Sequence, residues 1–257
     1  MPPPPIPPRI VGIPPTIPLR PDPSSSGASD DDKRPYTPVY LRVNRTSWLL
    51  PNFELRVEDV SHPGAQLFFE HVRPAEALRD AVISTCSWLY TLRDVPMNVQ
   101  NVLLVLRPMP GVAYTTGSRT HKEIHFSVNH IQKSAARAKA EILGVLTHEM
   151  VHCFQYNAKG TCPGGLIEGI ADWVRLNSGL APPHWKRGKG NKWDGGYDTT
   201  AFFLAWIEEQ CGKGTIYQLN AAMNDRPYLE SLFQDLTGSS VHELWRLYKL
   251  DAASETS

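Results

Sequence analysis

The stretch Leu146–Gln155, LTHEMVHCFQ, decides the fold because it places two histidines and a glutamate in an otherwise apolar run. His148 and His152 are four residues apart, a spacing that puts them on one face of an α-helix, one turn apart. Glu149 lies about 100° further around the helix. Two imidazole nitrogens can therefore bind one ion while the carboxylate reaches a water on that ion, as in the HExxH arrangement with zinc.

The residues around these three side chains favour a metal site over a chance match. An unpaired imidazole or carboxylate costs about 1–3 kcal/mol when it is buried, and a bound cation is the simplest compensation. The stretch therefore predicts a zinc ion held by His148 and His152, with Glu149 as a general base. The apolar neighbours on which this rests are Val145, Leu146, Met150, Val151, Cys153 and Phe154.

A zinc site needs at least a third protein ligand, and Glu168 is the first candidate. It follows the turn-forming stretch TCPGG, 161–165, and lies at the start of a second predicted helix, 166–179. A helix, a reversal and a second helix can bring this carboxylate back to the ion. His184 and Asp194, in the loop that follows, remain alternative third ligands.

Asp172 lies four residues after Glu168, on the same face of the second predicted helix. We expect it to accept a hydrogen bond from the outer ring nitrogen of a histidine ligand, which fixes the tautomer of that histidine. The apolar residues around the two carboxylates favour this interpretation over a solvated helix face. They are Leu166, Ile167, Ile170, Ala171 and Val174.

The periodicity of the chain predicts an α+β fold, with strands in the first half and helices in the second. In 122–131, KEIHFSVNHI, apolar and polar residues alternate, so we expect a strand with one polar face that forms the edge of a substrate cleft. His125 and His130 are expected only on the surface of this strand. The predicted strands are 53–57, 101–108 and 122–131, and the predicted helices are 74–92, 132–157, 166–179, 199–210, 215–224 and 241–250.

The ends of the chain differ in composition from its middle. Residues 1–38 hold 13 of the 23 prolines, which predicts a tail without a packed core. A partner of the SH3 or WW type could bind this tail, although an uncommitted tail is the simpler interpretation. One domain is expected over 39–250, followed by a short tail over 251–257.

Charge and cysteine content exclude several classes of protein. The formal net charge is zero, so neither nucleic acid nor an anionic membrane is an expected partner. No apolar run approaches the roughly 18 residues that cross a bilayer, and the prolines near the N-terminus argue against a signal peptide. Four cysteines are too few for a disulfide scaffold. Cys153 and Cys162 are expected as free thiols, with a bridge between them as the alternative.

The motif HExxH followed by ExxxD resembles the gluzincin branch of the zinc metallopeptidases. The longer run LTHEMVHCFQYNAKGTCPGGLIEGIADWVRL, with EIHFSVNHI before it and WDGGYDTTAFFLAWIE after it, resembles the plant basic secretory proteins, a zinc peptidase family with relatives in fungi and bacteria. The resemblance covers most of residues 50–250. It implies a zincin-like fold, with a small twisted sheet over a metal-bearing helix and a helical C-terminal half.

The resemblance also implies a reaction, the hydrolysis of peptide bonds, with Glu149 taking a proton from a zinc-bound water. A second group should stabilise the oxyanion, and Tyr197 in WDGGYD is the first candidate, ahead of His184. The basic loop 184–194 would then be a lid or rim that receives acidic substrates, or simply a solvated loop.

Two other functions remain open at this point. One is a metal-bearing binding or stress-response protein that is catalytically silent, and the other is an aminopeptidase or glycopeptidase with a narrow substrate range. The localisation is open as well. Relatives named for secretion suggest export, whereas the neutral chain with its proline-rich start leaves the cytoplasm possible.

Overall fold

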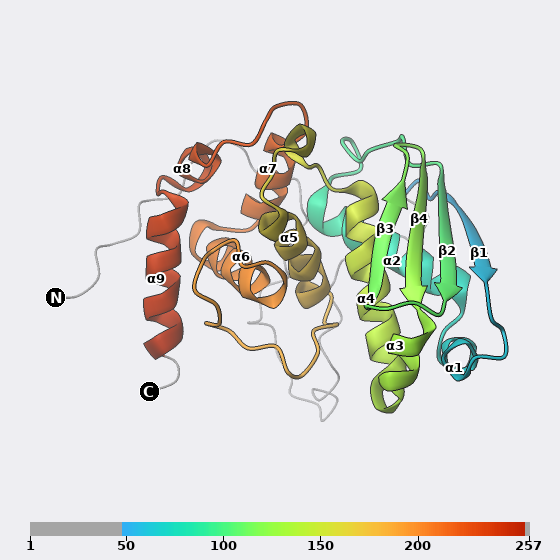
Figure 1. Ribbon diagram of the computed structural model, residues 1–257. Helices are drawn as coiled ribbons and strands as arrows, with labels where there is room; N and C mark the ends of the chain where they lie inside the picture. The colour runs from blue at the N-terminus through green and yellow to red at the C-terminus, as the bar shows by residue number, and fades with distance from the viewer. Residues whose placement is uncertain (1–47, 255–257) are drawn as a thin grey trace, which may run out of the picture.

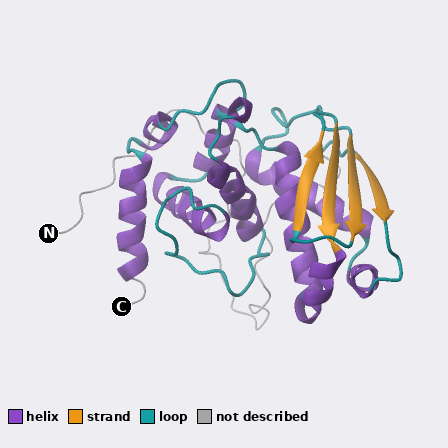
Figure 2. Ribbon diagram, viewed as in Figure 1, coloured by secondary structure: helices purple, strands orange, loops and turns teal. Residues whose placement is uncertain are grey.

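The computed structural model describes residues 48–254. It has an α+β fold, with a four-stranded sheet in the N-terminal half and helices in the C-terminal half, as Figures 1 and 2 show. The predicted fold class is therefore confirmed at this level. The expected tail over 1–38 lies outside the described residues. The last helix continues to Ser254, beyond the expected end of the domain at residue 250.

The sheet has the order β1-β2-β4-β3. β1 pairs in parallel with β2, and β2 pairs in parallel with β4, whereas β3 is antiparallel to β4 and forms one edge. β2 lies between β1 and β4, and its buried residues Val102, Leu104, Val105 and Leu106 account for its apolar sequence. The strands are β1 Asn52–Val57, β2 Asn101–Arg107, β3 Ala113–Gly117 and β4 His121–Ser127.

The predicted strand over 122–131 is wrong in its second half. β4 ends at Ser127, and α3, Val128–Lys133, begins directly after it. The Ser127 hydroxyl accepts a hydrogen bond from the His130 backbone N–H and so caps this helix. β4 also lies inside the sheet between β2 and β3, and neither Ser127 at its end nor Asn129 on α3 lines the cleft described below. β3 forms the edge instead, and it was not predicted.

The single helix predicted over 132–157 is also interrupted. Between α3 and α4, Ala138–Phe154, lies a 3-10 turn at Ala135–Arg137. Arg137 has φ −140° and ψ 30°, outside the helical region, and this separates the two helices. α4 therefore starts later than predicted, but it carries the whole HExxH motif in its last three turns.

The other predicted helices are confirmed within a few residues, and two helices were not predicted. The two that were missed are α1, Pro63–His71, and α8, Ser231–Thr237. The confirmed helices are α2 Pro74–Leu89, α5 Gly164–Asn177, α6 Tyr197–Cys211, α7 Thr215–Ala222 and α9 Val241–Ser254.

α4 lies at the centre of the molecule, between the sheet and the helical half (Figures 1 and 2). It packs on β3 and β4 on one side and on α2 and α5 on the others. A helix surrounded in this way is apolar on nearly all faces, and polar residues that it does carry have a specific role or a partner. Thirteen buried positions in α4 include His148 and Glu149.

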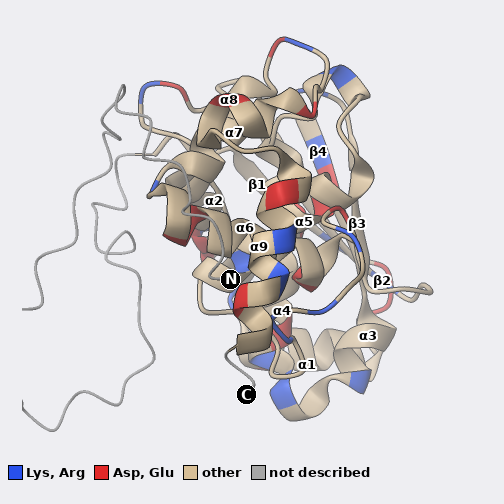
Figure 3. Ribbon diagram, turned by 90° about the vertical axis from the view of Figure 1, so that its left-hand side faces the viewer, with Lys and Arg blue, Asp and Glu red and all other residues tan. Residues whose placement is uncertain are grey.

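The distribution of charged residues and the state of the cysteines agree with what the composition predicts. Acidic and basic residues are interspersed over the ribbon, as Figure 3 shows. Cys153 and Cys162 are free thiols, as expected, and so are Cys86 and Cys211. Among the described residues, no helix has the length and apolar character needed to cross a membrane.

Candidate active site

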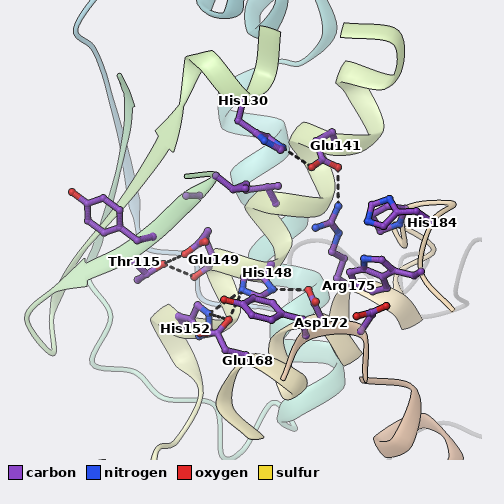
Figure 4. Close-up of a pocket in the computed structure, with 18 of the residues that line it drawn as sticks. Thr115, His130, Glu141, His148, Glu149, His152, Glu168, Asp172, Arg175 and His184 are labelled. Atoms are coloured by element: carbon purple, nitrogen blue, oxygen red, sulfur yellow. Dashed lines mark hydrogen bonds and ion pairs between the residues drawn. The ribbon is translucent and has the colours of Figure 1, made fainter. Parts of the chain in front are cut away.

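Three side chains from two helices converge beside the sheet. The Nε2 atoms of His148 and His152 lie 3.1 Å apart, and Oε2 of Glu168 lies 3.1 Å from the first and 3.7 Å from the second. Ligand bonds of about 2.0–2.2 Å in a tetrahedral site put ligand atoms about 3.3–3.6 Å apart. The three atoms therefore fit a zinc ion, and Figure 4 shows them facing one point.

The alternative third ligands do not join this group. Asp194 lies near Lys192, with Oδ1 3.4 Å from Nζ. His184 lines the same cleft but is not one of the residues whose ligand atoms come together. Glu168 reaches the histidines because α5 runs back along α4 after the turn at Pro163.

Asp172 orients the first histidine, in the position predicted from its spacing. Nδ1–H of His148 donates to Oδ1 of Asp172 at 2.6 Å, and the carboxylate is 3% exposed. Burial alone would lower the pKa of His148, but its hydrogen bonds with Asp172 and Glu168 raise that pKa to about 10. The bond to Asp172 leaves Nε2 directed at the point shared with His152 and Glu168.

The pKa of Glu168 is shifted in the opposite direction, downward. Burial alone would raise its pKa, but the hydrogen bonds from His148 and His152 hold the pKa well below its usual range. The carboxylate is thus ionised at any pH at which the imidazoles could bind a metal. An ionised oxygen donor and two ring nitrogens form a donor set that suits zinc.

Gln155 is an orienting residue that sequence reasoning missed. Its Nε2 lies 3.1 Å from Nδ1 of His152, and its Oε1 is buried without a partner among the described residues. When His152 binds a metal through Nε2, Nδ1 carries the hydrogen and needs an acceptor. Rotation of the Gln155 amide by half a turn would present Oε1 to this hydrogen, at the expense of the 3.4 Å contact that Nε2 now makes with the Ile167 carbonyl.

Glu149 turns away from the three ligands, toward the edge strand. The Thr115 hydroxyl lies 2.7 Å from Oε2 of Glu149 and 3.0 Å from its backbone oxygen. This contact holds one carboxylate oxygen in place and leaves Oε1 for another partner (Figure 4). Thr115 lies on the short strand β3, and no local sequence pattern connects it with α4.

Tyr197 lies over His148. The two ring centroids are 6.2 Å apart, with the planes 12° from parallel. Tyr197 has φ 47°, a left-handed conformation that is uncommon for an aromatic residue and frequent at functional sites. The negative charge of Glu168 raises the pKa of the Tyr197 hydroxyl, so that this group stays a hydrogen-bond donor at neutral pH.

A glycine contact brings the Tyr197 loop to the site. A Cβ atom on Gly165 would lie 1.9 Å from the carbonyl oxygen of Asp194, so only glycine permits this approach. Gly196, with φ 81°, packs against the same glycine. The first turn of α5, which precedes Glu168, therefore fixes the start of α6, where Tyr197 lies.

The two histidines expected on a strand surface lie elsewhere. His125 is 6% exposed, and its ring stacks on Tyr114 with centroids 4.7 Å apart. His130 lies on α3 and borders the cleft, where its Nε2 is 2.7 Å from Oε1 of Glu141. Neither is among the residues that could hold the metal.

One cleft of about 810 Å³ is lined by most of the side chains described above, namely Thr115, His148, Glu149, His152, Glu168, Asp172 and Tyr197. β3 and the residue before it border one side, and the residues around the proposed metal ligands form the floor. The cleft continues past the metal ligands to a group of charged residues that includes Glu141 and Arg175.

Comparison with known families agrees with this arrangement. A family model described as "Peptidase of plants and bacteria", abbreviated BSP, matches residues 50–248. The chain belongs to this family. The match covers every described strand and the α4–α5 pair, and it confirms the resemblance to the basic secretory proteins. No curated protein and no solved structure matches the chain.

The name of the family describes its members as peptidases, which hydrolyse peptide bonds. The formal net charge of this chain is zero, although the proteins that it resembles are called basic. The cleft, with its converging ligand atoms and the carboxylate beside them, is where such a reaction would take place.

Proposed function

We propose that the protein is a zinc-dependent peptidase, with His148, His152 and Glu168 as zinc ligands. The observation that carries this proposal is the convergence of three ligand atoms at separations of 3.1, 3.1 and 3.7 Å. Glu149 follows the first ligand directly and lies outside the ligand group. This is the division of roles expected when two histidines bind the metal and a glutamate moves protons.

A zinc ion held there would lower the pKa of a bound water from near 16 to about 7 and would polarise the peptide carbonyl. Glu149 takes the proton of the attacking water and passes it to the leaving amine. Positioned proton transfer of this kind contributes about 10²–10⁴-fold to the rate. Thr115 fixes Oε2 of Glu149, so Oε1 is the atom that accepts the proton.

Tyr197 is the proposed donor to the oxyanion. Its ring lies over His148, and Tyr197 lines the same cleft as Glu149. A peptide in extended form would lie along the cleft and pair, through main-chain hydrogen bonds, with the edge of β3 that no other described strand occupies. Val112, Ala113 and Tyr114 border the cleft at this edge.

The second candidate function is a zinc-bearing binding protein that cleaves nothing. The contact between Thr115 and Glu149 favours the enzyme, because a metal scaffold needs no positioned base. The aminopeptidase alternative has less support, because the other carboxylates that line the cleft already have basic partners that compete with a free amino terminus: Glu141 pairs with Arg137 and Arg175, and Asp198 with Lys189.

Metal content and turnover, measured together, test the proposal. We expect about one zinc per chain in the wild type by mass spectrometry, much less in Glu168→Ala, and full zinc in Glu149→Gln. Peptide cleavage should be lost in both variants. Full zinc in Glu168→Ala would remove this residue from the ligand set, and undiminished cleavage by Glu149→Gln would refute its role as the base.

A further inference from the structure

A second group of charged side chains shares the cleft with the proposed metal ligands. Glu141 is 5% exposed and accepts from three donors: Nε2 of His130 at 2.7 Å, Nη1 of Arg137 at 2.6 Å and Nη2 of Arg175 at 3.0 Å. Burial alone would raise the pKa of Glu141, but His130 and the two guanidinium charges lower it to about 2. We name these four residues the basic cluster (Figure 4).

The basic cluster lies at a fixed distance from the metal ligands. Glu141 precedes His148 by seven residues on α4, and Arg175 follows Glu168 by seven on α5. Seven residues are two helical turns, or about 10 Å along each axis. The guanidinium of Arg175 bonds to the carbonyl oxygen of Leu180 and to Glu141, so it lies at the level of Glu141 along the helix pair.

The charges of the cluster do not cancel. Glu141 neutralises one of the two guanidinium groups, which leaves one positive charge before His130 is counted. Asp172 also attracts Arg175, but Asp172 accepts a hydrogen bond from His148, and its charge is offset when a cation is bound there. Lys189, at the same end of the cleft, is 3.5 Å from Asp198 and adds no net charge.

Donors remain for a further anion. Arg175 uses Nε on the carbonyl of Leu180 and Nη2 on Glu141, and its Nη1 has no acceptor among the described residues. Its guanidinium is held against the ring of Trp185, 5.2 Å from the centroid. Arg137 keeps 34% of its side chain exposed at the mouth of the cleft. A guanidinium held in this way is suited to binding a carboxylate through two hydrogen bonds.

We infer that the basic cluster is a specificity subsite that binds a carboxylate of the peptide substrate. The inference rests on the proposed function for the position of the cleaved bond. Three extended residues span about 10 Å, and an acidic side chain covers part of that distance itself. The carboxylate therefore belongs to a residue one to three positions from the cleaved bond, as an Asp or Glu side chain or as the chain terminus.

Peptide binding can test this subsite without any turnover. Glu149→Gln, loaded with zinc, would be titrated with fluorescent peptides by anisotropy. The peptides form matched sets, with Glu, Gln or Lys at each position near the centre and with a free or an amidated C-terminus. We expect one position at which Glu binds about tenfold more tightly than Gln. The free and amidated forms separate a side-chain carboxylate from a terminal one.

Arg137 is the residue to change, because Arg175 is buried and its replacement could prevent folding. Arg137→Gln in the same background should abolish the preference for Glu, and Arg137→Glu should reverse it toward Lys. Arg73→Gln is the matched control, since Arg73 is 82% exposed and lies outside the cleft. An unchanged preference in Arg137→Gln and Arg137→Glu would overturn the inference.

The subsite and the proposed function can fail separately. Cleavage by the wild type without any preference for acidic residues would leave the peptidase in place and refute the subsite. A preference for Glu that depends on Arg137, in a protein that cleaves none of the peptides, would keep the subsite and refute the peptidase.

Discussion

Thr115 and Glu149 lie 34 residues apart, and the Thr115 hydroxyl is 2.7 Å from Oε2 of Glu149. The same hydroxyl is 3.0 Å from the backbone oxygen of Glu149. One hydroxyl hydrogen is thus shared between the side chain and the main chain of the proposed base. The strand that would bind the substrate is therefore also the strand that orients the proton acceptor.

Thr115→Val should lower kcat about tenfold with little change in KM, because the valine keeps the shape of the side chain but leaves the Glu149 carboxylate free to rotate. Thr115→Ser should restore most of the rate, since it restores the hydroxyl. Zinc content should stay the same in both variants. A fall in kcat that serine does not reverse would show that Thr115 acts only through packing.

Gln155→Leu should weaken zinc binding about 10–100-fold, because Nδ1–H of His152 then has no acceptor. Affinity would be measured by competition with a chelator. Asp172→Asn offers a comparison, since it changes the equivalent partner of His148. Zinc affinity equal to that of the wild type in Gln155→Leu would argue against the orienting role.

Gly165→Ala should displace the loop before α6, because the new Cβ would meet the Asp194 carbonyl at 1.9 Å. Tyr197 moves with this loop, so kcat should fall by at least tenfold while zinc is retained. Gly164→Ala is the control, since nothing lies within 4 Å of a Cβ at that position. Equal activity of Gly165→Ala and Gly164→Ala would show that activity does not depend on the contact at Gly165.

Tyr197→Phe keeps the ring over His148 and removes only the hydroxyl. We expect kcat to fall about 10²-fold with KM nearly unchanged, as when an oxyanion donor is removed. Steady-state kinetics on one peptide substrate would check this. Activity within twofold of the wild type would assign Tyr197 to packing and leave His184 as the candidate donor.

The pKa of Glu141 predicts how stability depends on pH. Because this pKa is lowered to about 2 in the folded protein, ionised Glu141 stabilises the fold above its unfolded pKa near 4.5, and this contribution is lost as the pH falls toward 2. Glu141→Gln should cost about 3 kcal/mol at pH 7 and much less near pH 3. Urea unfolding of both metal-free proteins would measure the difference, and a pH-independent cost would contradict it.

Sequence alone could predict the helix pair that carries the proposed metal ligands because all of its signals are local. The spacing of His148 and His152, the turn before α5 and the spacing of Glu168 and Asp172 each lie within a few residues. Helix periodicity then places the side chains on facing surfaces. The structure brings these four side chains, His148, His152, Glu168 and Asp172, into contact as expected.

The end of β4 was harder to predict, because the alternation typical of a strand continues past Ser127, where a helix already begins. Apolar and polar residues keep alternating through Val128 and Asn129, although the Ser127 hydroxyl already caps a helix. β3 escaped prediction because AYTTG is short, ends in glycine and borders solvent. Without β3, neither the cleft edge nor the role of Thr115 could be found.

The contacts of Glu141 were beyond sequence reasoning for another reason. Its partners come from α3, from the turn before α4 and from α5, which are brought together only by the fold. Nothing in the local pattern distinguishes a buried glutamate on α4 from a solvated one. The same holds for Gln155, whose role depends on the direction of one imidazole ring.

The antiparallel pairing of α4 and α5 has a consequence for how this protein can change. Glu141 contacts Arg175, and two turns further along α4 His148 contacts Asp172. Both contacts therefore depend on the same relative position of the two helices along their axes. Deleting one residue between Asp172 and Arg175 would turn Arg175 by about 100° away from its partner. A change in length within either helix would therefore break one of the two contacts, so the interval between the proposed metal ligands and the basic cluster is set by the helices themselves.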